Sequence, residues 1–184
     1  MAYAGFLWAL DQTFVDRLTA SSNEELIAVI QHELYENYYL NHKDLFVWID
    51  KPWDIIHCIL TDGTPQWEEG GDEYYPLDHL ILGGQWLYEV DNREKKPGWS
   101  SEPGAREGYF IVLKTPQQVS DVAQAIAPIT LSMFEGRFSQ IDPAYLGVNG
   151  DLWLEWAWVR FEEVREFWLR TATSGRHILL TVDT

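Results

Sequence analysis

The sequence predicts an α+β fold in which several helices pack with a small central sheet of about three or more strands. Three apolar segments have the composition of buried strands, while the chain between them shows mainly helical spacing of apolar residues. These segments are residues 3–9, 109–114 and 177–182. A chain of 184 residues is long enough for one domain and short for two, so residues 1–184 are expected to form a single compact domain.

Capping patterns mark the starts of two predicted helices. Ser22 with Glu25, and Thr115 with Gln118, have the spacing of a capping box, in which the two side chains satisfy each other's free backbone donors. Apolar stripes predict further helical segments at residues 11–20, 53–60, 77–82, 129–138 and 152–172. Residues 152–159 also alternate as a strand does, so helix and strand both remain open for that segment.

Two polar segments, residues 64–76 and 91–108, are expected to be exposed loops because they are rich in glycine, proline and charge. Each contains a tryptophan, Trp67 in the first and Trp99 in the second. An exposed tryptophan beside acidic residues is typical of a protein-binding hot spot. The alternative is a loop anchored to the domain by its own tryptophan. The candidate partner-binding residues are Trp67, Glu68, Glu69, Asp72, Glu73 and Trp99.

The net charge of −16, from 29 acidic and 13 basic residues, indicates which partners to expect. Such a charge repels phosphate backbones and anionic lipids, so we expect no nucleic acid and no membrane as partner; a cationic protein is favoured. An acidic surface that only maintains solubility is the simpler alternative. The first ten residues lack a basic segment and no apolar run reaches the ~20 residues of a membrane span. The expected location is therefore cytoplasmic.

Sequence motifs give little support to an enzyme. The chain lacks a dinucleotide-binding glycine pattern, a P-loop and a Gly-x-Ser-x-Gly turn, so no cofactor is expected. Its single cysteine, Cys58, excludes an intramolecular disulfide. A metal site built from His57, His79 and Asp78 is chemically permissible, but no ligand spacing favours it, and we expect no metal.

The predicted helix after Asp50 and Pro52 provides one candidate ligand pocket. Asp50 is the expected cap, and Pro52 fits the first turn. Trp53 and His57 then share a helix face at positions i and i+4, where a nearby carboxylate could orient the imidazole as a general base. The alternative is a histidine packed beneath a tryptophan in the core. The candidate pocket residues are Asp50, Trp53, His57, Gly83 and Gly84.

Several segments together resemble the YfbM-like family of bacterial proteins. They are Asp50 to Gly63, Pro76 to Gly84, Tyr109 to Val122 and Phe161 to Val182. The resemblance covers most of the chain, although its two polar loops are longer than is usual in the family. It implies a compact α+β domain of unknown function and supplies no catalytic residue.

The sequence thus leads to two hypotheses about function. The first is a non-enzymatic cytoplasmic binding protein, such as an immunity-type antitoxin that occludes a basic toxin, acting as a monomer or homodimer. The second is a small-ligand-binding enzyme of hydrolase type that uses the Trp53/His57 face near Gly83 and Gly84.

Overall fold

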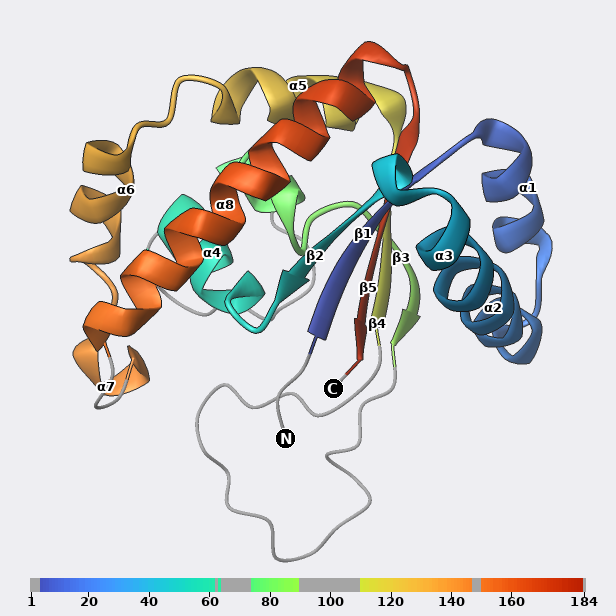
Figure 1. The fold of residues 1–184 in the computed structure, drawn as a ribbon, viewed down its shortest axis with the longest axis horizontal. Helices are drawn as coiled ribbons and strands as arrows, with labels where there is room; N and C mark the ends of the chain where they lie inside the picture. The colour runs from blue at the N-terminus through green and yellow to red at the C-terminus, as the bar shows by residue number, and fades with distance from the viewer. Residues whose placement is uncertain (1–3, 62, 64–73, 90–109, 147–149, 184) are drawn as a thin grey trace, which may run out of the picture.

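The centre of the fold is a five-stranded antiparallel sheet with the strand order β2-β1-β5-β4-β3 (Figure 1). The computed structural model describes residues 4–61, 63, 74–89, 110–146 and 150–183. The strands are β1 (Ala4–Leu10), β2 (Phe46–Asp50), β3 (Gln85–Glu89), β4 (Phe110–Lys114) and β5 (His177–Asp183). The first and last strands of the sequence are adjacent at the centre, where they protect each other from solvent.

Helices cover both faces of the sheet (Figure 1). One face packs against α1 (Gln12–Ala20), α2 (Asn23–Val29), the π-helix η1 (Ile30–Tyr38) and α3 (Tyr39–Asn41). The other packs against α4 (Trp53–Leu60), α5 (Pro116–Ile126), α6 (Leu131–Phe138), α7 (Pro143–Leu146) and α8 (Gly150–Thr173). Side chains alternate between the two faces along each strand. In β4, for example, Ile111 and Leu113 face the α1–η1 side, whereas Val112 faces the α8 side.

The predicted α+β fold is confirmed, and so are both capping boxes. Residues 152–159 lie in the long helix α8, which resolves the helix-or-strand alternative. The decisive contacts are tertiary, because Ala157, Phe161, Val164 and Trp168 form one buried stripe against the sheet and α5. The strands β2 and β3 were not predicted. Both are five-residue strands at the edges of the sheet, where part of each strand stays exposed and the apolar signal is weak.

The expected helix cap at Asp50 is wrong. Asp50 is the last residue of β2, pairs with Gly5 of β1 and has a φ of 61°. Helix α4 instead begins after Pro52, and the carboxylate of Asp54 accepts the backbone N–H of Ile55 at 2.7 Å. Asp50 therefore belongs to the strand, and a short turn at Lys51 and Pro52 separates it from the first residue of the helix.

The helix that begins at Ser22 is continuous with η1 and α3 but changes its hydrogen-bonding pattern. Residues 30–38 form a π-helix of nine residues, longer than the single-turn π-bulges that account for most such segments. Within it, Tyr35 approaches the sheet, and its hydroxyl lies 2.8 Å from Oγ1 of Thr181 on β5. Trp8 of β1 donates to the same oxygen at 3.0 Å. The π segment is thus tied to the centre of the sheet.

None of the helices in the described part of the chain combines the length and apolar character needed to cross a membrane.

Candidate functional site

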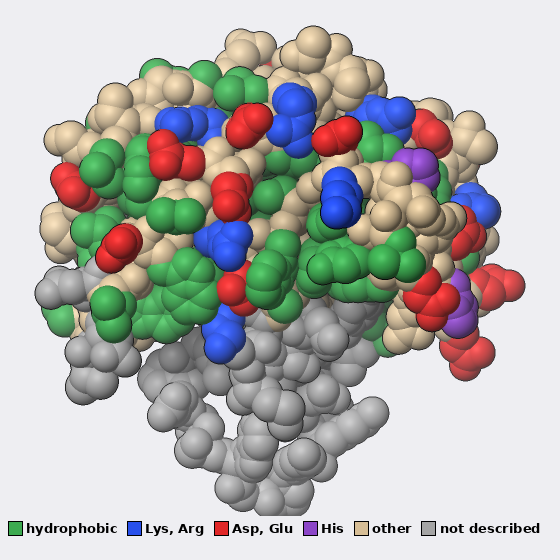
Figure 2. Space-filling model, viewed as in Figure 1, with side chains coloured by type: hydrophobic (Ala, Val, Ile, Leu, Met, Phe, Trp, Pro, Cys, Tyr) green, Lys and Arg blue, Asp and Glu red, His purple; other side chains and the backbone are tan. Residues whose placement is uncertain are grey.

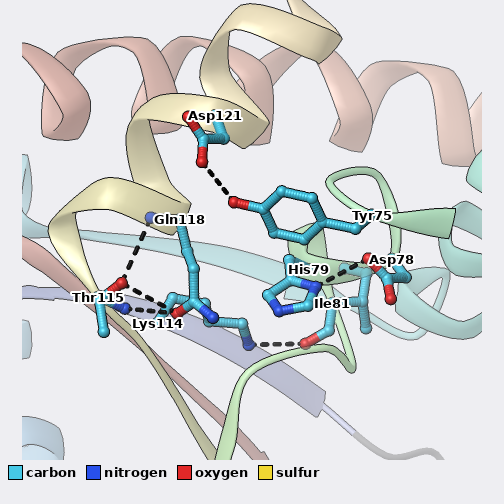
Figure 3. Close-up of polar contacts among 8 residues, drawn as sticks. All are labelled: Tyr75, Asp78, His79, Ile81, Lys114, Thr115, Gln118 and Asp121. Atoms are coloured by element: carbon cyan, nitrogen blue, oxygen red, sulfur yellow. Dashed lines mark hydrogen bonds and ion pairs between the residues drawn. The ribbon is translucent and has the colours of Figure 1, made fainter. Parts of the chain in front are cut away.

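A buried lysine marks the first candidate site. Lys114 is the last residue of β4 and has no exposed surface. Its Nζ donates a hydrogen bond to the carbonyl oxygen of Ile81 at 2.7 Å (Figure 3). Because Phe110 and Val112 face the α8 side of the sheet, alternation along β4 directs Lys114 toward that side as well. An ionisable side chain thus occupies a position that the strand pattern assigns to the core.

Two further titratable groups lie beside this lysine. The short 3₁₀ helix η4 (Asp78–Leu80) carries Asp78 and His79, both buried. Nδ1 of His79 lies 2.8 Å from Oδ1 of Asp78. A carboxylate acceptor at Nδ1 holds the ring proton there and leaves Nε2 as the basic nitrogen. In Figure 3 this second ring nitrogen is on the side of the ring where the Lys114 amino group lies.

The environment of Lys114 controls its protonation. Burial lowers the pKa of Lys114 well below its ordinary value, because the ammonium form loses its hydration in the interior. The negative charge of Asp78 acts in the opposite direction and has the smaller effect. The amino group is therefore neutral over a wider pH range than that of an exposed lysine.

Gly83 and Gly84 shape the backbone next to these groups. A Cβ on Gly83 would lie 2.2 Å from Nδ1 of His79, so only glycine allows the chain to pass this close to the ring. Gly84 has a φ of 123°, and a Cβ there would meet the carbonyl oxygen of Leu113 at 2.6 Å. Gly83 thus lies against His79, whereas Gly84 lies against Leu113 and Lys114. Their role as pocket residues stays a prediction.

Tyr75 covers this group from the solvent side. Its ring meets the ring of His79 edge to face at 4.8 Å between centroids, and its hydroxyl donates to Asp121 of α5. Tyr75 itself is 41% exposed. We call Tyr75, Asp78, His79 and Lys114 the Lys114 cluster (Figure 3). It combines an amine and an imidazole–carboxylate pair beneath the phenol ring of Tyr75.

The predicted Trp53/His57 face forms as expected on one helix but is enclosed. Both residues are 5% exposed and lie on the core side of α4. Trp53 packs edge to face against Phe110 at 5.5 Å between ring centroids. The carboxylate that lies in this region is Asp54, which accepts the hydroxyl of Tyr145 at 2.8 Å. Ligand binding at Trp53 and His57 stays a prediction.

The permissible metal set does not assemble in the described part of the chain. His79 and Asp78 are adjacent, but they and His57 form no group of three or more ligands that could hold a metal ion there.

An acidic helical layer is the second feature of interest. Residues 11–41, which form α1, α2, η1 and α3, contain a single basic residue, Arg17, and its guanidinium pairs with Glu33. The same segment contains six acidic residues: Asp11, Asp16, Glu24, Glu25, Glu33 and Glu36. Figure 2 shows acidic side chains gathered at the lower right, over α2 and η1. We call these six residues the acidic layer.

Aromatic side chains continue from the acidic layer to the edge of the sheet. Phe6 stacks with Trp8 at 5.5 Å and with Trp48 at 6.3 Å between ring centroids. Phe46 contacts Trp8 at 5.4 Å and Tyr39 at 5.1 Å. We call Phe6, Trp8, Tyr39, Phe46 and Trp48 the aromatic edge. Tyr39 and Trp48 are 47% and 42% exposed, and the neighbouring Leu40 is 68% exposed.

The aromatic edge already contacts one cation. The guanidinium of Arg160, on α8, lies 5.3 Å from the ring centroid of Trp48. Such an arrangement attracts cations to the face of an indole ring. In the view of Figure 2, apolar side chains form a band over β2 and the N-terminal half of α8.

The sequence-predicted partner-binding residues fall outside the part of the chain that the structure describes. Their positions, which fall between 67 and 73 and at 99, are outside the described residues. Trp67, Glu68, Glu69, Asp72, Glu73 and Trp99 therefore remain predictions. The sequence did not predict that the acidic layer and the aromatic edge form one surface. Their residues come from three separate segments of the chain, which only the fold brings together.

The sequence and the fold both resemble those of known proteins. A family model described as a domain of unknown function, DUF1877, matches residues 1–181. The chain belongs to the DUF1877 family. A solved structure titled a protein of unknown function, YfbM from Escherichia coli, matches this DUF1877 chain with a TM-score of 0.59 and 18% sequence identity, covering 99% of both chains. The resemblance to YfbM-like proteins is therefore confirmed, and the likeness shows the fold alone. A search among curated proteins found no match.

Proposed function

We propose that this DUF1877 domain is a non-enzymatic binding protein for a cationic protein partner. One observation carries the proposal: the acidic layer adjoins the partly exposed aromatic edge, so charge and apolar contact area meet on one surface. Glu36 of η1 is one helical turn from Tyr39 and Leu40, at the junction of the two features.

The two features have different physical roles in this proposal. Carboxylates on the surface steer a cationic partner and raise the rate of association by roughly 10 to 10³ at low salt. Aromatic side chains provide affinity, because tryptophan and tyrosine bury a large area at a small loss of conformational entropy. Trp48 and Tyr39 are the expected anchors, since both project from the surface while their neighbours are fixed by ring contacts.

An immunity-type antitoxin is the form of this function that we favour. A small acidic domain that occludes a basic toxin needs a charged and partly apolar surface but no catalytic group. The whole-chain charge of −16 supports this pairing, and Trp67 and Trp99, in segments that the sequence predicts to be exposed loops, are further candidate contacts. We expect the partner to be a basic protein encoded next to this one.

Co-expression with the proteins encoded in the neighbouring reading frames tests the proposal, and a basic one among them should form a complex with this chain. Calorimetry of the purified pair in 50 mM and 300 mM NaCl should show weaker binding at the higher salt concentration, because salt screens exposed charges. Trp48→Ala should weaken binding by about 30-fold, the effect of removing an interface anchor worth about 2 kcal/mol.

Met133→Ala is the matched control. Met133 is also exposed, at 46%, but it lies on α6, which packs on the opposite face of the sheet from the acidic layer. This variant should bind as the unmodified protein does. Absence of a complex at 50 mM NaCl, or equal affinities of the two variants, would contradict the proposal. Self-association in gel filtration without the partner would indicate that a second copy covers the surface instead.

A further inference from the structure

We propose that the Lys114 cluster is a site for small uncharged aldehydes or ketones, in which Lys114 forms an imine with the carbonyl carbon. The proposal concerns a separate part of the fold from the acidic layer and goes beyond partner binding. It stands on the juxtaposition of a buried amine, an imidazole–carboxylate pair and a partly exposed covering ring (Figure 3).

The position of Lys114 makes its amino group a nucleophile. An amine attacks a carbonyl only in its neutral form, and a desolvated lysine in an apolar pocket is a standard way to obtain that form near neutral pH. Lys114 is fully enclosed, and its pKa is lowered by burial. The hydrogen bond from Nζ to the Ile81 carbonyl fixes the position of the nitrogen.

The Asp78–His79 pair is placed to move the protons. Asp78 accepts at Nδ1 and thereby orients the imidazole, so Nε2 is the exchangeable site. Nε2 lies on the Lys114 side of the ring in Figure 3. A correctly oriented imidazole of this kind is the most common general acid and base in proteins. His79 is the proposed catalytic acid and base, and Asp78 is a positioning residue.

The reaction can be written with all atoms balanced. The nitrogen lone pair of Lys114 adds to the carbonyl carbon, a C–N bond forms, and His79 carries one proton from the nitrogen to the former carbonyl oxygen to give a neutral carbinolamine. His79 then donates a proton to the hydroxyl group, which leaves as water when the C–O bond breaks, and takes back the remaining proton of the nitrogen. Amine and carbonyl compound thus become imine and water, and no oxidant or reductant is needed.

The surroundings select the class of compound. Two buried aliphatic residues adjoin the cluster: Leu80 follows His79 in η4, and the carbonyl group of Ile81 accepts the hydrogen bond from Lys114. Asp78 places a negative charge beside the amine, and the whole chain carries −16, so an anionic carbonyl compound is disfavoured. Small size and absence of charge are therefore the expected features of the ligand.

Access requires movement of Tyr75. Its ring covers His79, but the ring is 41% exposed and its hydroxyl is held by Asp121 at the surface. Opening therefore requires the Tyr75–Asp121 hydrogen bond to break and the Tyr75 ring to separate from the His79 ring. Tyr75 is thus a positioning residue that controls entry to the cluster.

Among the described residues, several charged and titratable groups face Lys114 and bear on a pH series. Asp78 and His79 face it from η4, and Tyr75 with Asp121 lies above them. On the adjacent strand β5, His177 interacts with the backbone of Lys114, and burial lowers the pKa of His177. Its Nε2 lies 3.0 Å from Oε1 of Gln12.

Reductive methylation of the unmodified protein is the direct test, with formaldehyde as the carbonyl compound and cyanoborohydride to trap the imine. Peptide mass spectrometry compares Lys114 with the exposed Lys43 and Lys51, which serve as internal controls in the same sample. At pH 6.5, Lys114 should be methylated faster than either control, because burial lowers its pKa and leaves more of its amine neutral. This preference should shrink at pH 10, where exposed lysines also lose their proton.

Two variants separate a reactive site from a structural lysine. Tyr75→Ala should speed the methylation of Lys114, and His79→Gln should slow it, while Lys43 and Lys51 keep their rates in both. Methylation of Lys43 and Lys51 with Lys114 unmodified would overturn the proposal. So would methylation of Lys114 only at the rate of global unfolding, measured by hydrogen exchange in the same buffer. Partner binding by the acidic layer can fail or succeed independently of either result.

Discussion

At the scale of single residues, the Lys114 cluster shows how one backbone position constrains a buried polar group. Gly83 passes so close to His79 that a side chain at this position would displace the imidazole from Asp78. The glycine is required by packing here. The sequence could mark Gly83 as unusual, because it stands in a pair with Gly84, but it could not show that the close neighbour is a histidine.

Gly83→Ala should therefore lower the free energy of unfolding by about 1–3 kcal/mol, the usual effect of forcing atoms into a filled interior. Urea denaturation followed by tryptophan fluorescence measures it. Gly136→Ala is the control, because no atom lies within 4 Å of its added Cβ and the residue is exposed on α6. That substitution should stabilise the protein by up to about 1 kcal/mol through helix propensity. Equal effects of the two substitutions would refute this account of Gly83.

At the scale of elements, the π-helix η1 is the feature that local sequence rules describe least well. A capping box and an apolar stripe predict a helix after Ser22, and a helix is present. Its change to π geometry at Ile30 coincides with a contact to the sheet, because Tyr35 reaches the hydroxyl of Thr181. Thr181 is fully buried, so its hydroxyl must find partners inside the protein.

Tyr35→Phe removes this hydroxyl and tests whether it holds the π segment. The expected loss of stability is about 1 kcal/mol, because Trp8 still donates to Thr181 while one partner of a buried polar group is lost. Compared with the unmodified protein, the variant should show faster amide hydrogen exchange in residues 30–38, and this increase should exceed any increase in α5. Tyr39→Phe is the matched control, since the hydroxyl of an exposed ring should matter little. An unchanged exchange rate in the Tyr35 variant would mean that η1 is maintained by its apolar contacts alone.

At the scale of the whole molecule, charge is distributed unevenly along the described surface. Residues 11–41 contain the six carboxylates of the acidic layer and one arginine, a net charge of −5. Helix α8 has five acidic and three basic residues, a net charge of −2, and its arginines pair with nearby glutamates. Folding brings the carboxylates of the acidic layer close together, and they repel one another. A cationic partner would relieve part of this repulsion.

Raising the NaCl concentration from 20 mM to 300 mM should accordingly stabilise the isolated protein, with an increase of a few degrees in the midpoint of thermal unfolding. Salt shortens the range of electrostatic repulsion from about 20–30 Å to less than about 10 Å, so carboxylates on opposite sides of the acidic layer no longer repel one another. The combined substitution Glu24→Gln and Glu36→Gln should reduce the salt effect, whereas Glu162→Gln, which removes a partner of Arg165, should not. A salt effect that is identical in all three proteins would show that the acidic layer is not its source.

The sequence by itself determined the α+β fold, the buried strands β1, β4 and β5, both capping boxes and the family resemblance. These follow from local patterns, since apolar runs, helical stripes and capping residues act over a few positions along the chain. Tertiary structure alone decided that residues 152–159 are helical, that Asp50 ends a strand, and that Lys114 is buried beside Asp78 and His79. Each of these depends on contacts between residues far apart in sequence, and the energy of such contacts exceeds the local preference that the sequence displays.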